Sequence, residues 1–231
     1  MTIGVMDSGI GGLNVLAALI KNRVADRYIY LSDGANLPYG NKGGGVLKEI
    51  ALAGCRELTE RGANAIVFGC NTLSVSTLDY VRKRVVPPVF GLVPRPDLLS
   101  GKALMMTTPT TALYLPEMKK NVSLLTPAEL ASVIDGEYPK SEATRAYLSP
   151  LLLPYADCEE VYLGCTHYLY AKEVVKTILP HAKIHDGVEH LAALVRAVLP
   201  PSESKNPSIE MVFTGKRQAE RYLTLLSSLL K

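Results

Sequence analysis

Short runs rich in β-branched and aromatic residues alternate with helical patterns along the whole chain of 231 residues. The runs that predict strands lie at 3–6, 28–31, 65–68, 89–92, 103–107, 122–125, 160–163, 183–185 and 210–213. The helical patterns between them lie at 13–22, 45–60, 74–84, 111–119, 127–134, 141–153, 169–178, 188–198 and 217–229. Strands that alternate with helices in this way form parallel sheets covered by helices. The sequence therefore predicts an α/β fold.

The chain contains a weak internal repeat. The segments AIVFGCNT at 65–72 and EVYLGCTH at 160–167 each read as an apolar strand, then Gly-Cys, then polar residues that open a helix. Open α/β sheets bind ligands at the carboxyl ends of their strands. We therefore expect two similar lobes, each a mainly parallel sheet flanked by helices, with the active site in the cleft between them. The expected lobes are 1–93 plus 188–231, and 94–187, with a linker at 200–207.

The chain has four cysteines, Cys55, Cys70, Cys158 and Cys165. No two of them form a C-x-x-C pair, which argues against a zinc ribbon or a thioredoxin-like motif. The chain is also too long for a disulfide-stapled miniprotein. We expect free thiols, and the question is which of them take part in chemistry.

Cys70 and Cys165 occupy matching positions, each after a strand and a glycine and at the start of a helix. The exposed N–H groups of a helix start favour a thiolate. Asn71, Thr72 and Thr166 follow the cysteines and supply donors for an anion such as a carboxylate. A single buried cysteine is often only a small hydrophobic residue. Two in matching contexts favour a pair of catalytic thiols.

The remaining cysteines lack this context. Cys55 lies inside the helical run ALAGCRELTE with no glycine turn before it, and Cys158 lies in the polar stretch ADCEE. The pair Cys165-x-His167 with a distant cysteine also admits a metal site. No fourth ligand is evident, so we expect no metal. Structural or solvated roles are expected for the other histidines, His181, His185 and His190.

Two further strand ends carry polar side chains. The opening segment IGVMDSGIGG is a strand, a glycine-rich turn and a helix, with Asp7 and Ser8 at the strand end. Its glycine spacing does not fit the dinucleotide-binding fingerprint, and no P-loop lysine follows. Asp7 therefore either faces the cleft or caps the helix. The segment LSDGANLPYG presents Asp33, and then Tyr39 and Gly40, from the next predicted strand.

Taken together, these segments resemble the glutamate racemase family of the aspartate/glutamate racemase superfamily. The matching segments are IGVMDSGIGGLNVL, SDGANLPYG, GCNT at 69–72, PVFGLVP at 88–94, TTPTT at 107–111, LGCTHY at 163–168 and FTG at 213–215. They follow the family's order and cover most of the chain. As a set, DSG-x-GG with a later CNT and GCTHY is highly specific.

The resemblance implies a racemase that interconverts L- and D-glutamate with no cofactor, neither metal nor pyridoxal phosphate. Cys70 and Cys165 would stand on opposite faces of the α-carbon, the first acting on the D-isomer and the second on the L-isomer. Asp7 and His167 match residues that assist the thiols. The positions that match substrate-binding residues are Asp7, Ser8, Tyr39, Gly40, Asn71, Thr72, Thr166 and His167. The resemblance also implies a homodimer.

The chain departs from the family pattern at several positions. Gly34 stands where a threonine commonly follows the aspartate, and Arg95 replaces a small residue after PVFGLVP. In TPAELASVIDGE at 126–137, Asp135 takes the place of a glutamate. Asp135 and Asp33 are therefore expected to be supporting residues. The departures affect loops beside the site and leave both matching cysteines unchanged.

Composition excludes several classes of protein. Lys and Arg number 25 against 22 Asp and Glu, a net charge of +3, and the basic residues are scattered. No nucleic-acid footprint is therefore expected. No apolar run approaches the ~18 residues of a transmembrane helix. The N-terminal residues do not read as a signal peptide, so we expect a cytoplasmic protein that is not bound to a membrane.

Three functions remain open at this stage. The first is a glutamate racemase that supplies D-glutamate for peptidoglycan. The second is a related racemase that acts on aspartate or a hydantoin. The third is a non-catalytic binding protein of the same fold, against which the presence of Cys70, Cys165, Asp7 and His167 argues.

Overall fold

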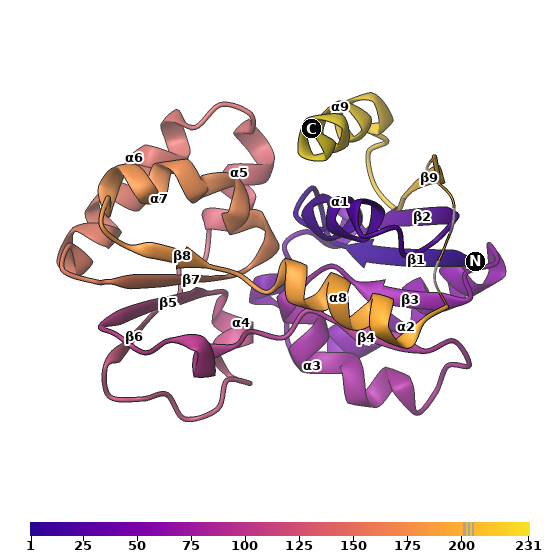
Figure 1. Cartoon of the computed structure of the whole chain (residues 1–231), viewed down its shortest axis with the longest axis horizontal. Helices are drawn as coiled ribbons and strands as arrows, with labels where there is room; N and C mark the ends of the chain where they lie inside the picture. The colour runs from indigo at the N-terminus through magenta and orange to yellow at the C-terminus, as the bar shows by residue number, and fades with distance from the viewer. Residues whose placement is uncertain (201, 203, 205) are drawn as a thin grey trace.

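The computed structural model describes residues 1–200, 202, 204 and 206–231, and it contains two parallel sheets (Figure 1). The first has the order β4-β3-β1-β2-β9, with strands β1 (Thr2–Asp7), β2 (Arg27–Ser32), β3 (Ala65–Phe68), β4 (Val89–Gly91) and β9 (Ser208–Phe213). The second has the order β6-β5-β7-β8, with strands β5 (Ala103–Thr107), β6 (Val122–Leu125), β7 (Glu160–Gly164) and β8 (Lys183–His185). The predicted fold class, two parallel sheets flanked by helices, is confirmed.

The longer helices are α1 (Leu13–Lys21), α2 (Gly44–Glu60), α3 (Asn71–Arg82), α5 (Leu130–Glu137), α6 (Glu142–Leu152), α7 (Lys172–Ile178), α8 (Val188–Val198) and α9 (Ala219–Leu230). In the first sheet, successive side chains point to opposite faces. Ile3 and Val5 therefore lie in one core with α1, α8 and α9, whereas Met6 packs with α2 and α3. The apolar run of β1 is buried on both faces, as expected for a central parallel strand.

Helix α2 lies directly on β1. A Cβ atom added to Gly4 would come within 2.9 Å of Leu58 Cδ1, so the glycine makes room for this leucine. Leu58 is fully buried, and so is Cys55 one turn earlier on the same helix. This close packing fixes the position of β1, which carries Asp7 at its carboxyl end.

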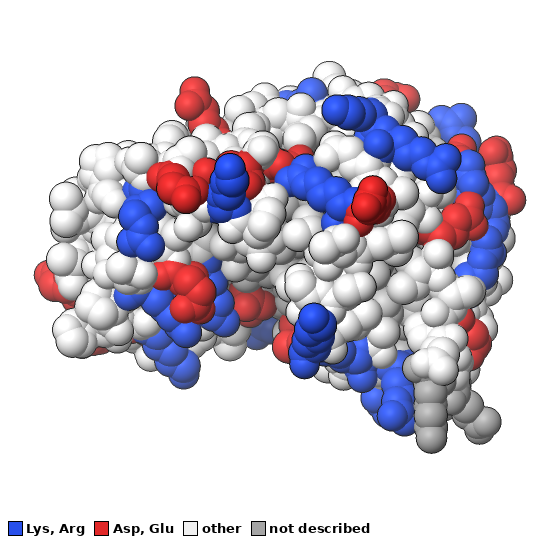
Figure 2. All heavy atoms as spheres, turned by 90° about the horizontal axis from the view of Figure 1, so that it is seen from above, with Lys and Arg blue, Asp and Glu red and all other residues white. Residues whose placement is uncertain are grey.

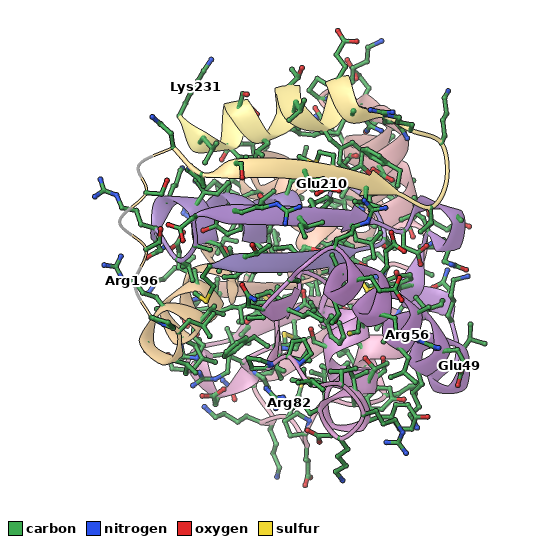
Figure 3. The ribbon with its side chains drawn as sticks, turned by 90° about the vertical axis from the view of Figure 1, so that its right-hand side faces the viewer. Glu49, Arg56, Arg82, Arg196, Glu210 and Lys231 are labelled. Carbon is green, nitrogen blue, oxygen red and sulfur yellow. The ribbon has the colours of Figure 1, made fainter. Side chains whose placement is uncertain are left out.

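Strand β9 joins the first sheet although it follows every strand of the second sheet in the chain. It pairs in parallel with β2, from Arg27 opposite Ser208 to Ser32 opposite Phe213. The Glu210 carboxylate accepts hydrogen bonds from Arg27 Nη2 at 2.6 Å and from Arg61 Nη1 at 2.7 Å. Figure 3 shows Glu210 on this strand and α9 along the same edge of the molecule. These partly exposed ion pairs add little stability, but they fix the register of β9.

Several segments differ from the sequence-based prediction, and helix α5, expected at 127–134, lies three residues later at Leu130–Glu137. The helix expected at 111–119 is only the short α4 (Pro109–Ala112), because Pro116 cannot continue a helix. Helix α3 begins at Asn71 instead of residue 74. Helix α7 begins at Lys172 and is preceded by a 3₁₀ helix at Thr166–Ala171. The linker predicted at 200–207 includes Pro201, Glu203 and Lys205, which lie outside the described residues.

Within the described part of the chain, no helix is both long enough and apolar enough to cross a bilayer. On the face shown in Figure 2, basic and acidic side chains are interspersed over a largely uncharged surface.

The packing of α2 on β1 predicts the effect of truncating Leu58. Because Leu58 is fully buried, we expect Leu58→Ala to lower the free energy of unfolding by about 2–5 kcal/mol. Leu223→Ala is the matched control, since Leu223 is 46% exposed on α9, and we expect it to change stability by less than about 1 kcal/mol. Urea unfolding followed by circular dichroism measures both. Equal losses in the two variants would contradict this view of the core.

Candidate active site

Cys70 and Cys165 lie at the carboxyl ends of β3 and β7, one strand from each sheet. Both have extended backbone, Cys70 just before α3 and Cys165 just before the 3₁₀ helix. They are 6% and 5% exposed. A negative charge on Cys165 raises the pKa of Cys70, so the two thiols are close enough to interact electrostatically. The two sheets thus bring the predicted pair into one buried site.

Burial dominates the protonation of both thiols. It raises the pKa of Cys165 to about 12 and that of Cys70 well above its ordinary value. The backbone N–H groups of Thr72 and Leu73 oppose this shift at Cys70, and those of His167 and Tyr168 oppose it at Cys165. The sequence-based expectation that the helix starts favour thiolates was therefore incomplete. Desolvation outweighs the N–H groups, and both thiols are neutral at pH 7.

Asp7 is a fully buried carboxylate at the end of β1. Its Oδ1 accepts a hydrogen bond from the Gly9 N–H at 2.8 Å, and its Oδ2 accepts one from Thr166 Oγ1 at 3.3 Å. Burial raises the pKa of Asp7 to about 6, although the neighbouring His167 lowers it. Asp7 thus links the first sheet to the segment that follows Cys165, and it titrates close to neutral pH.

The turn after β1 is rich in glycine because side chains from the second sheet fill the space beside it. A Cβ on Gly9 would lie 2.9 Å from His167 Nε2 and 2.8 Å from Asp135 Oδ2. A Cβ on Gly11 would lie 2.5 Å from His167 Nδ1. His167 and Asp135 therefore converge on one point beside Asp7. His167 Nε2 and Asp135 Oδ1 are buried and have no hydrogen-bond partner among the described residues.

The loop after β2 places Tyr39 beside Cys70, in the same core, and Tyr39 contacts Asp33. The Tyr39 hydroxyl donates to Asp33 Oδ2 at 2.7 Å, and Asn36 and Thr214 also donate to this carboxylate. Burial raises the pKa of Tyr39 well above its ordinary value, and the charges of Asp33 and Cys70 raise it further. Asp33 therefore organises the loop through Tyr39.

Of the polar residues at the start of α3, Asn71 contacts the segment after β4 and Thr72 contacts the segment after β5. Asn71 Nδ2 donates to the Leu92 carbonyl at 3.2 Å, while its buried Oδ1 has no partner within the described ranges. Thr72 Oγ1 lies 2.9 Å from Thr108 Oγ1 and 3.1 Å from Thr111 Oγ1. The predicted residues Ser8 and Thr166 are also buried at this junction, 3% and 1% exposed.

The threonines that follow β5 have no role predicted from the sequence. Thr108 precedes α4, and its Oγ1 accepts a hydrogen bond from the Thr111 N–H. A Cβ on Gly40 would lie 2.7 Å from the Thr108 side chain, so the predicted residue Gly40 allows the loop and the threonine to meet. Threonine before proline is a usual helix start, and this signal was present in TTPTT.

Cys55 and Cys158 lie outside the site, as expected, and both are buried in the hydrophobic core. Of the other histidines, His181 is exposed, His185 Nε2 lies 3.0 Å from Glu160 Oε1, and His190 Nε2 lies 3.1 Å from Arg95 Nη1. A surface cavity of about 600 Å³ between α2 and β9 is lined by neither Cys70 nor Cys165. Among the described residues, no group of three or more His, Cys, Asp or Glu side chains is arranged to hold a metal ion.

Solved structures of glutamate racemases superpose on this chain. The glutamate racemase of Campylobacter jejuni superposes with a TM-score of 0.82 at 20% identity, over 100% of this chain and 98% of the other. The Escherichia coli glutamate racemase, solved with L-glutamate and the activator UDP-MurNAc-ala, superposes with a TM-score of 0.79 at 26% identity, over 99% of this chain and 94% of the other. The fold thus places the chain in the class of α/β racemases with two parallel sheets.

Sequence comparison gives the family. The glutamate racemase of Leptospira interrogans is 30% identical in an alignment that covers 100% of this chain and 97% of the relative. The chain therefore belongs to the glutamate racemase family, a family of isomerases, and the resemblance seen in the sequence motifs is confirmed. No family model matches the chain.

The buried charge of Asp7 predicts a stability that depends on pH. The pKa of Asp7 rises from 3.8 to about 6 on folding, so the native state holds a proton that the unfolded state releases. The free energy of unfolding of the native protein therefore falls as pH rises from about 4 to 6. At about 1.4 kcal/mol per pKa unit, the raised pKa of Asp7 lowers the free energy of unfolding at pH 8 by about 3 kcal/mol.

We expect Asp7→Asn to remove this cost, because the amide still accepts from Gly9 and donates to Thr166 Oγ1. The variant should be about 1–3 kcal/mol more stable than the native protein at pH 8, and the difference should vanish near pH 4. Urea unfolding at both pH values measures the effect. A variant that is less stable at pH 8 would contradict the assignment of a costly buried carboxylate.

Proposed function

We propose that this protein interconverts L- and D-glutamate by moving the α-proton between Cys70 and Cys165, with no cofactor. One observation carries the proposal: two buried thiols, delivered by different sheets, flank one junction, where Thr72 after Cys70 contacts Thr108 and Thr166 after Cys165 contacts Asp7. A hydrogen next to a carboxylate is very weakly acidic, so its removal needs a positioned base and stabilised charge. Inversion needs a second group on the far side, because a single base returns the proton to the face it left.

The protonation of the thiols fits this reaction. One cysteine must be a thiolate and the other a neutral thiol at the start of each turnover, and their roles reverse in the opposite direction. Burial keeps both neutral in the protein alone. The ammonium group of a bound amino acid adds a positive charge that favours one thiolate, and the proton that this thiol gives up passes to the neighbouring Asp7 carboxylate. The backbone N–H groups at the start of α3 and of the 3₁₀ helix then stabilise it.

The surrounding residues have distinct proposed roles. Cys70 acts on the D-isomer and Cys165 on the L-isomer. Asp7 and His167 assist the thiols, and Asp135 supports His167. The residues that we propose to bind the substrate are Asp7, Ser8, Tyr39, Gly40, Asn71, Thr72, Thr166 and His167. The unpartnered Oδ1 of Asn71 is an acceptor for the substrate ammonium.

We further propose that residues 1–93 with 188–231 form one lobe and residues 94–187 the other. The pairing of β9 with β2 supports the return of the chain to the first lobe. The thiols are only 5–6% exposed, so substrate entry requires the two lobes to separate. The cleft between them is then both the entrance and the site of reaction.

The protein is proposed to act in the cytoplasm, where it supplies D-glutamate for peptidoglycan. All four cysteines are free, and the mechanism requires two of them to stay reduced. A reducing compartment supports this state.

Exchange of the α-proton in deuterated water distinguishes the three candidate functions. We expect deuterium to enter both glutamate enantiomers, with little exchange of aspartate or hydantoins. Exchange of aspartate in preference to glutamate would instead show the related racemase. Binding of glutamate with no exchange would show a binding protein without catalysis and would refute the proposal.

Serine replacements test the two thiols. A serine hydroxyl is a much weaker base than a thiolate, so we expect Cys70→Ser and Cys165→Ser each to lower kcat by at least about a thousandfold. Cys55→Ser is the matched control, since Cys55 is buried away from the site, and it should keep most of the activity. Circular dichroism verifies folding. Turnover near the native rate in either of the first two variants refutes the two-thiol mechanism.

We also propose a homodimer. Exposed apolar side chains such as Val86, Leu113 and Leu153 offer surface for an interface. Light scattering coupled to size-exclusion chromatography should give a mass close to twice 25.0 kDa. A mass of one chain at micromolar concentration would rule the dimer out.

A further inference from the structure

Arg221 on α9 reaches across to α5, which belongs to the second sheet's helices. Its Nη2 donates to the main-chain carbonyl of Asp135 and to that of Tyr138, the latter at 3.5 Å. Its Nη1 donates to Gln218 Oε1 at 3.0 Å, which fixes the guanidinium from its own side. Figure 1 shows α9 and α5 facing each other beside the junction of the two halves. The guanidinium thus caps the carbonyl end of α5, where a positive charge is favourable.

The Asp135 carboxylate lies between Arg221 and the catalytic site. Its Oδ1 is 3.9 Å from Arg221 Nη2. Its Oδ2 and His167 Nε2 both lie within 3 Å of the same point beside Gly9. Asp135 is only 8% exposed, and its negative charge raises the pKa of Asp7. The side chain is therefore buried beside His167 and Asp7, and Arg221 is the cation that compensates it.

We propose that Arg221 is a positioning residue of the racemase: it holds Asp135 beside His167. Helix α9 thereby supports the active site although it lies outside it. The inference rests on the proposed function, because His167 and Asp7 are taken there to assist the thiols. Arg221 itself touches neither thiol. Arg221 acts through the C-terminal end of α5, where it binds the carbonyls of Asp135 and Tyr138 and lies close to the Asp135 carboxylate.

The chemistry of the guanidinium explains why an arginine occupies this position. Its planar fork donates to two carbonyls and to Gln218 at once while it stays charged. A lysine carries the same charge but cannot make the same set of bonds. Asp135 is shorter than the glutamate common in the family, so its reach depends more closely on where α5 is held.

Kinetics of Arg221→Met test the proposal, with Arg217→Met as the matched control. Arg217 is exposed, lies four residues earlier, and forms no ion pair among the described residues. We expect Arg221→Met to lower kcat at least about tenfold in both directions, with KM changed less than about threefold. Arg217→Met should match the native protein. Because L- and D-glutamate are equally stable, kcat/KM must fall equally for both, which is an internal check.

The pH profile separates positioning from a general structural effect. The groups that feel the charge of Asp135 are Asp7, Tyr30, Tyr170 and Tyr222, and His167 lies beside it. Loss of the Arg221 charge favours protonated carboxyl groups, so the acid limb of kcat/KM should move to higher pH. Arg221→Lys keeps the charge and should keep the native acid limb with an intermediate kcat. A fall in kcat that follows only a lower Tm, with the acid limb unchanged, overturns the proposal.

The test also distinguishes failure of this inference from failure of the proposed function. The imidazole signals of His167, followed by NMR, report changes in its surroundings, which include Asp135 beside Gly9, without any turnover. If the native protein shows no racemisation but Arg221→Met shifts these signals and Arg217→Met does not, the positioning role stands and the proposed reaction falls. If the signals of both variants match the native protein, the positioning role is refuted.

Discussion

The whole site depends on a close contact beside the glycine-rich turn after β1. Here Asp7 from the first sheet meets His167 and Asp135, which follow or flank strands of the second. Side chains on Gly9 or Gly11 would occupy the space that His167 and Asp135 fill. The hydrogen bond from Thr166 to Asp7 crosses the same junction. The two sheets are therefore brought together through polar groups of the proposed site.

This arrangement costs stability. The fully buried Asp7 carboxylate, with a pKa near 6, is unfavourable in a protein interior, and so are the buried polar atoms of Asn71, Asp135 and His167 that have no partner among the described residues. The cores on both faces of the first sheet offset the cost. Polar atoms that have no partner among the described residues remain available to bind a substrate. These atoms lie where the two sheets meet.

Much of the fold could be predicted from local patterns. All nine strands were expected near their observed positions, because each apolar run is bounded by glycine, proline or polar residues. The pair Cys70 and Cys165 was predicted because each follows Gly at a strand end. The short α4 was mispredicted, since the helical pattern at 111–119 ignored Pro116. These are properties of neighbouring residues, which a single sequence displays directly.

Features that depend on residues far apart in the chain could not be predicted from the sequence in the same way. The pKa of the thiols depends on how completely two sheets exclude water, and local helix starts alone suggested the opposite direction. The meeting of Asp135 with His167, and of Arg221 with α5, joins residues far apart in the chain. Nothing adjacent to Arg221 marks it as different from Arg217. Only the assembled fold separates them.

The position of β9 has a consequence for biosynthesis. Ribosomes make this strand after every other strand, so β2 is an open sheet edge while the second sheet is being completed. Unpaired edges invite association between nascent chains. The nascent polypeptide is thus most exposed to aggregation just before β9 emerges, and the arrival of one short strand both closes that edge and allows α9 to dock.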